Sequence, residues 1–166
     1  MNDVYLLLGS NIGDRFKALQ KASILISDTI GEIVNKSGIY LTEPWGFDHP
    51  QDFYNHVLHI RTKSSPRNVL AFCLEIEKKM GRIRKKDHFE ARYIDIDLLL
   101  YNSEIIKNEE ITIPHPRLHL RRFTLEPLCE IAPNVIHPVL KKSMTELLAA
   151  CTDTCRVEKI DPSITN

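Results

Sequence analysis

The sequence has no long apolar run and no excess of charge of one sign. None of its hydrophobic stretches approaches the roughly 18 residues that a membrane span requires, so we expect no membrane contact. Lysine and arginine together number 22, as do aspartate and glutamate, and the formal net charge is therefore zero. This balance argues against a protein whose main partner is nucleic acid, but it leaves room for a local basic cleft.

Cysteine is sparse and forms no recognisable metal-binding or disulfide pattern. The four cysteines, Cys73, Cys129, Cys151 and Cys155, include no C-x-x-C pair. The start of the chain has no positively charged segment, and the apolar run at 4–8 is too short for a signal peptide. We therefore expect a cytoplasmic protein with reduced cysteines. The sequence also lacks a G-x-x-x-x-G-K-[ST] motif, which excludes a P-loop enzyme.

The length and the apolar spacing predict one α+β domain that spans residues 1–166. Strands and helices are expected in the order β-α-β-β-α-β, over residues 3–8, 16–30, 33–42, 53–62, 64–80 and 93–101. This is the order of a ferredoxin-like core, in which two helices cover one face of a mainly antiparallel four-stranded sheet.

The residues after 101 are predicted to complete α/β/α layers. A small hairpin would pair residues 104–106 with 111–113, and helices are expected near 122–130 and 143–151. We expect the hairpin and these helices to cover the second face of the sheet.

Two carboxylates share one face of the last predicted core strand. Side chains alternate along a strand, so Asp95 and Asp97 point the same way, with their Cα atoms about 6.5–7 Å apart. Aspartate is disfavoured in strands, and like charges this close repel one another. A solvated strand face is one interpretation. The other is a Mg²⁺ site, because Mg²⁺ binds one or two carboxylates together with water and substrate phosphates.

A basic segment precedes this strand. Arg82, Arg84, Lys85, Lys86 and Arg92 fall within eleven residues. The segment is either a solvated loop or, beside a carboxylate-bound cation, a set of ligands for polyphosphate. The position between a helix end and the aspartate pair favours the second interpretation.

Three other features have both a structural and a functional interpretation. Glu77 lies beside the apolar stripe of the second helix and is either a rim carboxylate or a nucleotide contact. His115 lies between two prolines and is either part of a rigid surface turn or a positioned donor. Trp45, Phe53 and Phe123 are either core residues or, because they fall in loops or at element starts, platforms for a planar ligand.

Several motifs of the chain together resemble one known family. Those motifs, in chain order, are residues 9–14 (GSNIGD), 42–46 (TEPWG), 53–55 (FYN), 81–84 (GRIR), 92–97 (RYIDID), 114–117 (PHPR), 122–128 (RFTLEPL) and 130–133 (EIAP). The ordered set resembles 6-hydroxymethyl-7,8-dihydropterin pyrophosphokinase of folate biosynthesis. The resemblance covers about residues 5–138, and no motif assigns the tail at 139–166.

The resemblance implies a reaction and a catalytic set. Such an enzyme transfers pyrophosphate from ATP to the hydroxymethyl group of the pterin and releases AMP. Asp95 and Asp97 would hold two Mg²⁺ ions that bridge the ATP phosphates. Arg82 and Arg92 would clamp phosphates during catalysis, with Arg84 nearby.

The resemblance also implies the remaining contacts of the two substrates. His115 and Arg121 would contact phosphates, and Glu77, Leu98 and Thr112 would line the nucleoside end of ATP. The residues that would surround the pterin are Thr42, Pro44, Trp45, Phe53, Asn55, Asp95 and Phe123. In one stretch the chain departs from the family, since Phe89-Glu90-Ala91 stands where tryptophan, glycine and proline are usual.

An RNA-binding module of the RRM type is the alternative, because it has the same β-α-β-β-α-β order. Against it, the RNP1 pattern is absent, and Asp95 and Asp97 would repel a phosphate backbone. We therefore expect a monomeric enzyme with small-molecule substrates and no nucleic-acid partner.

Overall fold

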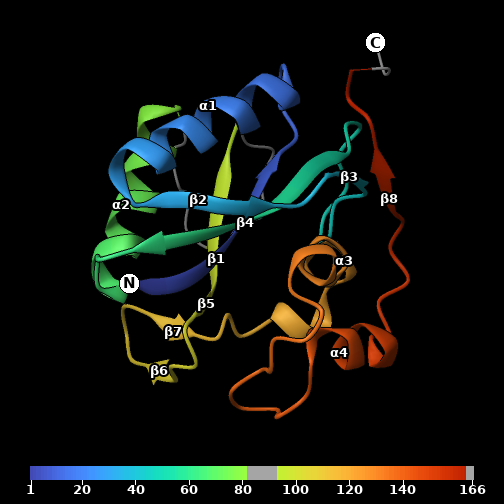
Figure 1. Cartoon of the computed structure of the whole chain (residues 1–166). Coiled ribbons are helices and arrows are strands. Elements are labelled where there is room, and N and C mark those ends of the chain that lie inside the picture. The colour runs from blue at the N-terminus through green and yellow to red at the C-terminus, as the bar shows by residue number, and fades with distance from the viewer. Residues whose placement is uncertain (82–92, 164–166) are drawn as a thin grey trace.

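The protein folds into an antiparallel sheet between two layers of helices (Figure 1). The structure is a computed structural model, and it describes residues 1–81 and 93–163. The strands of the main sheet are β1 (Asn2–Ser10), β2 (Glu32–Lys36), β3 (Ile39–Thr42), β4 (Phe53–Thr62), β5 (Asp95–Tyr101) and β8 (Val157–Ile160). The helices are α1 (Arg15–Thr29), α2 (Pro66–Lys79), α3 (Arg122–Ile131) and α4 (Met144–Ala150). A hairpin of β6 (Ile106–Lys107) and β7 (Thr112–Ile113) and a 3-10 turn (Leu118–Leu120) complete the elements.

The order of the main sheet is β5-β1-β4-β3-β8, with β2 also pairing with β4. Every pairing in it is antiparallel. The prediction of an α+β fold with a mainly antiparallel sheet is therefore confirmed. The sheet has six strands rather than the expected four.

Two features account for the extra strands. The segment expected as one strand over 33–42 is broken at Ser37 and Gly38. The Ser37 amide still bonds to the Val57 oxygen of β4, but the Val57 amide donates to the Ser37 hydroxyl, and the Gly38 amide donates to the Glu130 carboxylate. The tail also contributes β8, which pairs with β3 at the sheet edge. Two of the four residues of β8 are charged, so the spacing of apolar residues did not predict a strand there.

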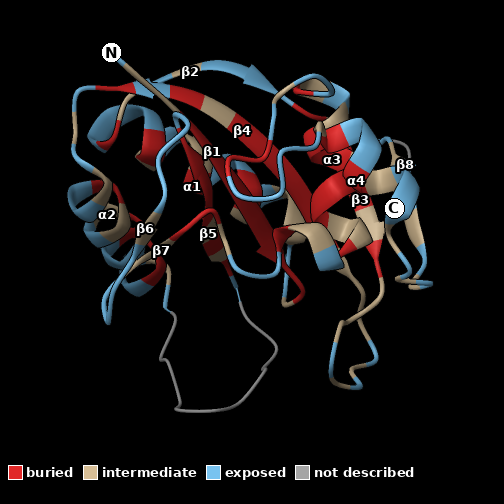
Figure 2. Cartoon of the chain, turned by 90° about the horizontal axis from the view of Figure 1, so that it is seen from below, coloured by how far each residue is buried: buried red, intermediate tan, exposed pale blue. Residues whose placement is uncertain are grey.

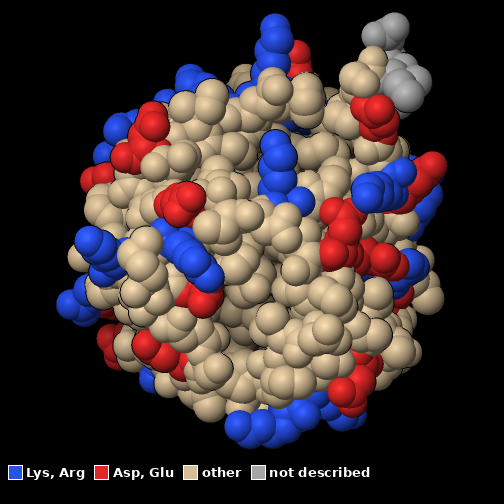
Figure 3. All heavy atoms as spheres, viewed as in Figure 1, with Lys and Arg blue, Asp and Glu red and all other residues tan. Residues whose placement is uncertain are grey.

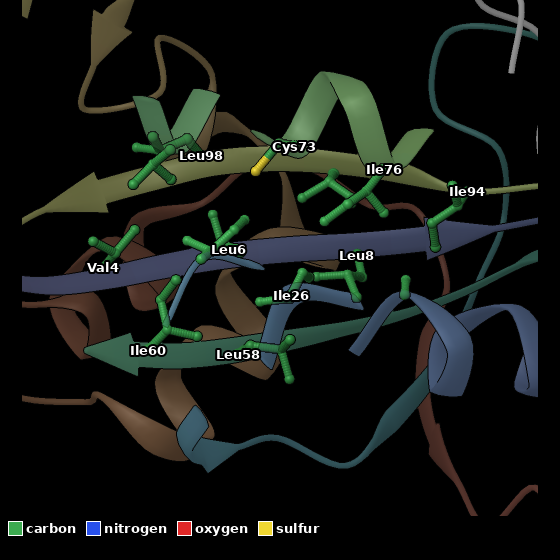
Figure 4. Close-up of a cluster of buried hydrophobic side chains, with 14 of the residues drawn as sticks. Val4, Leu6, Leu8, Ile26, Leu58, Ile60, Cys73, Ile76, Ile94 and Leu98 are labelled. Atoms are coloured by element: carbon green, nitrogen blue, oxygen red, sulfur yellow. The ribbon is translucent and has the colours of Figure 1, made fainter. Parts of the chain in front are cut away.

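Two apolar clusters lie on opposite faces of the sheet. Val4, Leu6 and Leu8 of β1 pack with buried residues of α1 and α2 (Figure 4). Tyr5 and Leu7 of the same strand pack with buried residues of α3 and α4. The strands between the two helix layers are accordingly the most deeply buried part of the molecule (Figure 2). The α/β/α layering is confirmed.

The hairpin does not lie where it was expected. Ile106, Ile111 and Ile113 pack against the cluster under α1 and α2, not against the face that α3 and α4 cover. The prediction that the hairpin helps to cover the second face is therefore wrong. Its short strands follow the edge strand β5, and the hairpin extends the α2 side of the sheet.

A β-bulge interrupts the alternation of β5. Tyr5 pairs with Leu100 but Leu6 pairs with Leu98, so Leu99 is an extra residue in β5. Leu99 and Leu100 consequently both pack toward α3 and α4. The alternation that sets Asp95 and Asp97 on one face also predicts Leu100 on the other face with Ile96, and the bulge shows that this second prediction is wrong.

Local signals at the helix ends agree with the structure. Asp14 caps α1 by accepting a hydrogen bond from the Lys17 amide at 3.0 Å. Gly31 follows the end of α1, and it is glycine because a Cβ there would collide with the backbone oxygen of Arg61. Acidic and basic side chains are interspersed on the face shown in Figure 3, as the zero net charge suggests. Among the described residues, no helix is both long and apolar enough to cross a bilayer.

Candidate active site

Several of the predicted site residues lie at one end of the sheet face that α3 and α4 cover. Asp95 of β5, Gly9 of β1, Asn55 of β4 and Tyr40 of β3 are cross-strand partners in one row. Directly paired residues of antiparallel strands point to the same face. The next row on this face contains Leu7, which belongs to the α3 and α4 cluster. The sheet itself therefore brings Asp95 and Asn55 to the same side, one strand apart.

Asp95 and Asp97 project from this face, as predicted. Asp97 pairs with Leu7, and both carboxylates are half-buried. Among residues 1–81 and 93–163, no group of three or more His, Cys, Asp or Glu side chains is placed to hold a metal. Two half-buried carboxylates still match Mg²⁺ chemically, since Mg²⁺ takes oxygen donors and completes its shell with water and substrate phosphates.

Asn55 and Thr42 form a buried polar wall beside the carboxylates. The Asn55 amide donates from Nδ2 to Thr42 Oγ1 at 2.6 Å, and both residues are nearly inaccessible to solvent. Phe53 pairs with Thr42 at the start of β4 and is half-buried. The ring of Phe53 contacts Phe47 edge to face, with centroids 6.1 Å apart. This arrangement offers an apolar ring beside fixed polar groups.

A buried arginine joins two of the aromatic residues. The Arg121 guanidinium lies 4.6 Å from the centre of the Trp45 ring and 5.3 Å from that of Phe123. Arg121 is only 6% exposed, which is unusual for arginine. Phe123 is half-buried against the cluster under α3. The sequence analysis named Arg121, Trp45 and Phe123 as site residues but did not predict that they stack. Pro44, which precedes Trp45 in the same loop, is also half-buried.

His115 is held in a neutral state at the edge of this group. Burial first, and then the positive charges of Arg121 and Arg117, lower the pKa of His115 to about 4 against the opposing effect of Asp95. The Arg117 amide donates to His115 Nδ1 at 3.1 Å, which leaves the proton on Nε2. The His115 amide donates to the Leu99 oxygen at 2.9 Å. The side chain is thus a positioned neutral donor rather than a cation.

Three predicted residues lie apart from the carboxylate face. Leu98 packs under α2, and Thr112 is half-buried in β7. Glu77 of α2 is 2% exposed, and its Oε2 accepts a hydrogen bond from the Ile96 amide at 2.9 Å. Glu77 therefore holds the backbone of β5 between the two aspartates. The interpretation of Glu77 as a simple rim carboxylate does not fit this burial.

Three predicted arginines, Arg82, Arg84 and Arg92, lie outside the described residues. Two residues of the row, Gly9 and Tyr40, were not predicted as site residues from the sequence. Gly9 lies between Asp95 and Asn55, and β1 continues through it to Ser10, beyond the end of the strand expected at 3–8. A glycine inside a buried strand is the signal that points to it, because glycine there marks a close approach of another group.

Known proteins resemble this chain over most of its length. The family profile described as 7,8-dihydro-6-hydroxymethylpterin-pyrophosphokinase (HPPK) matches residues 5–133. A 2-amino-4-hydroxy-6-hydroxymethyldihydropteridine pyrophosphokinase of Aquifex aeolicus is 40% identical over 146 residues, which cover 88% of this chain and 90% of the relative. A protein of the same name from Bacillus subtilis is 39% identical over 137 residues, or 81% of each chain.

Solved structures show the same fold in longer chains. A crystal structure of an HPPK-DHPS protein in complex with substrates matches 90% of this chain with a TM-score of 0.73 at 15% identity. The wild-type HPPK-DHPS of Plasmodium falciparum gives a TM-score of 0.70 at 18% identity. The chain spans 43% of the length of either structure. With the profile and the close relatives, this likeness shows that the chain belongs to the 7,8-dihydro-6-hydroxymethylpterin-pyrophosphokinase family and is a pyrophosphokinase of that family.

Proposed function

We propose that this enzyme transfers the β,γ-pyrophosphoryl group of ATP to the hydroxymethyl oxygen of 6-hydroxymethyl-7,8-dihydropterin, in the folate pathway. A bond forms between that oxygen and the β-phosphorus, the bond from the β-phosphorus to the α-phosphate bridging oxygen breaks, and AMP leaves. The hydroxyl proton passes to solvent. The observation that carries the proposal is the shared row of Asp95 and Asn55, which sets a carboxylate beside a polar wall fit for a flat heterocycle.

Asp95 and Asp97 are the proposed ligands of two Mg²⁺ ions. When bound, the ions neutralise the polyphosphate charge that develops during transfer. The two carboxylates would hold the cations from one face of β5. His115 would offer a neutral N–H, and Arg121 a buried cation, to the phosphates. Arg82, Arg84 and Arg92 are proposed as further phosphate ligands on the strength of the family motif.

The pterin is proposed to lie on the same face. Its ring edge carries donors and acceptors, which match Asn55 and Thr42, while Phe53 and Phe123 supply apolar faces. Pro44 and Trp45 border this end from the loop after β3. Asp95 would face both the metal and the pterin.

The nucleoside is proposed to bind near the β5 edge, on the side of β7. Leu98, Thr112 and Glu77 surround this edge, from β5, β7 and α2 respectively. Glu77 would act there through the strand backbone as well as through any contact with the nucleotide.

The strand order supports a ferredoxin-like core within the wider sheet, since β5-β1-β4 followed by β2 and β3 is the order of that motif. It does not favour the RRM alternative. The sheet face opposite α1 and α2, which such a module would use for RNA, is covered here by α3 and α4. Monomeric state and cytoplasmic location stay expectations.

The proposal is tested by following AMP release with ATP, the pterin alcohol and Mg²⁺. We expect release only when all three are present. Asp95→Asn and Asp97→Asn should each lower kcat by a factor of at least about a hundred, because loss of a metal ligand costs several kcal/mol of charge stabilisation. Melting temperatures should stay close to that of the unmodified protein.

Asp28→Asn is the matched control, because Asp28 is an exposed aspartate on α1. This variant should keep full activity. Near-normal Mg²⁺-dependent turnover in Asp95→Asn and Asp97→Asn would contradict the metal assignment. Calorimetry with a non-hydrolysable ATP analogue, with and without pterin, then separates loss of binding from loss of chemistry.

A further inference from the structure

Gly9 is a strand residue without an evident backbone reason to be glycine. It is the eighth residue of β1, between Asp95 and Asn55 in the cross-strand row. The positive backbone angles that favour glycine occur at Gly13, Gly46 and Gly81, and Gly9 is not among them. Glycine is disfavoured inside strands, because it loses entropy on folding and packs no side chain.

The space above Gly9 is occupied by a side chain of the proposed pterin wall. A Cβ at residue 9 would stand inside contact distance of Asn55 Oδ1, and it would touch Asn55 Cγ at 3.5 Å and the Phe53 ring at 3.6 Å. The amide of Asn55 therefore lies across β1, directly over the bare Cα of Gly9.

Asn55 cannot simply move aside. Its Nδ2 is bound to Thr42 Oγ1 at 2.6 Å, and the residue is 4% exposed. The hydrogen bond to Thr42 fixes which end of the amide faces Gly9, namely the carbonyl oxygen Oδ1. The opening at Gly9 and the bond to Thr42 together determine the position of this acceptor.

We propose that Gly9 is a positioning residue for the pterin site: the missing side chain lets the Asn55 oxygen lie over β1, level with Asp95. Gly9 touches no substrate in this proposal and acts only through Asn55. The inference rests on the proposed function, because it takes the Asn55 wall to read the pterin edge. An acceptor at this position selects heterocycles that present an N–H to the wall.

The decisive variant is Gly9→Ala. We expect its Kd for the pterin to rise by about tenfold or more, because a misplaced acceptor loses its hydrogen bond. The Kd for a non-hydrolysable ATP analogue should change less than about twofold. In the ligand-free protein, the Asn55 side-chain amide resonance should shift, which reports its position without any substrate.

A second substitution isolates the contact. On an Asn55→Ser background, where the amide is gone, Gly9→Ala should change pterin affinity by less than about twofold. If Gly9→Ala alone does not fold and the double variant does, the contact is supported directly. Gly38→Ala is the matched control, because the atoms nearest to its Cβ would belong to the flexible Lys159 side chain and to Glu130, and not to Asn55.

The outcomes separate this inference from the proposed function. Gly9→Ala with unchanged pterin affinity and an unmoved Asn55 resonance would overturn the positioning role and leave the enzyme assignment intact. An Asn55→Ala variant that binds pterin like the unmodified protein would instead contradict the proposed pterin wall.

Discussion

His56 is a buried histidine that lowers the stability of the fold only at acidic pH. It is 5% exposed, and burial, with a smaller contribution from Lys36, lowers its pKa to about 4. Above about pH 6.5 both the folded and the unfolded states are neutral at this residue. Below that pH the unfolded chain takes up a proton that the folded chain refuses, so stability falls between about pH 6.5 and 4, by about 3 kcal/mol at most.

His56→Leu removes this proton linkage. We expect the free energy of unfolding, measured in urea from pH 7 to 4, to fall less steeply in this variant than in the unmodified protein. His49→Gln, a substitution in the loop after β3, should keep the full slope. Identical slopes for His56→Leu and the unmodified protein would show that His56 does not stay neutral in the folded state.

Phe123 is either a substrate contact or a core residue, and one substitution distinguishes the two interpretations. It packs on Arg121 and on the cluster under α3, yet it is only half-buried. If it stacks on the pterin, Phe123→Ala should weaken pterin binding by about 1–3 kcal/mol and leave ATP-analogue binding unchanged. A stability loss of about 3–5 kcal/mol with intact pterin affinity would mark it as core alone. Melting temperature and the two affinities decide between these outcomes.

At the scale of elements, the carboxylate of Glu130 links the three elements α3, β3 and β8. Glu130 of α3 accepts hydrogen bonds from the Gly38 amide and the Tyr40 hydroxyl, and it pairs with Lys159 of β8 at 2.6 Å. Burial alone would raise the pKa of Glu130, but these partners outweigh it and the pKa lies below its ordinary value. The network thus holds the edge strand β8 and the break before β3 to the helix layer.

Glu130→Ala should loosen this edge. We expect a loss of about 1–3 kcal/mol in urea unfolding and faster amide exchange in β8 than in β1. Because the folded pKa is lowered, the contribution of Glu130 is present above the usual carboxyl pKa and disappears as acid protonates it. Glu158→Ala, at an exposed position of β8, should have little effect on either measurement. Equal protection of β8 in both variants would contradict this role.

The elements also show what sequence could and could not predict. The spacing of Leu19, Ala22 and Ile26 gave α1, and its buried face follows that spacing. The period of two in β5 correctly placed Asp95 and Asp97 on one face. The same rule failed at Leu100, because a bulge is a matter of pairing with β1 and leaves no local signature. Gly9 was missed for a similar reason, since its neighbour Asn55 is distant in sequence and adjacent only across the sheet.

For the whole molecule, β1 belongs to both cores. Leu6 faces the cluster under α1 and α2, and Leu7 faces the one under α3 and α4. The two layers should therefore unfold together. Leu6→Ala and Leu7→Ala should each cost about 2–5 kcal/mol and retain a single transition.

Two probes test this cooperativity. Far-ultraviolet circular dichroism follows all elements, and the fluorescence of the single tryptophan, Trp45, follows the site end. Coincident urea curves are expected for the unmodified protein and for both variants. Separate midpoints in Leu7→Ala would mean that the α3 and α4 layer melts independently.

The extra residue Leu99 shifts the alternation of side chains along β5 by one residue. On the carboxylate side of Leu99 the odd-numbered residues face α3 and α4, and beyond it this parity is reversed, so that Leu100 faces them and Tyr101 does not. Removal of Leu99 would leave every other side chain of β5 on its present face, because Leu98 and Leu100 already pair with Leu6 and Tyr5, which are consecutive in β1. The deletion would take one apolar side chain from the layer under α3 and α4 and leave Asp95 and Asp97 pointing as they do now. The bulge therefore adds to the packing of this face without deciding where the carboxylates point.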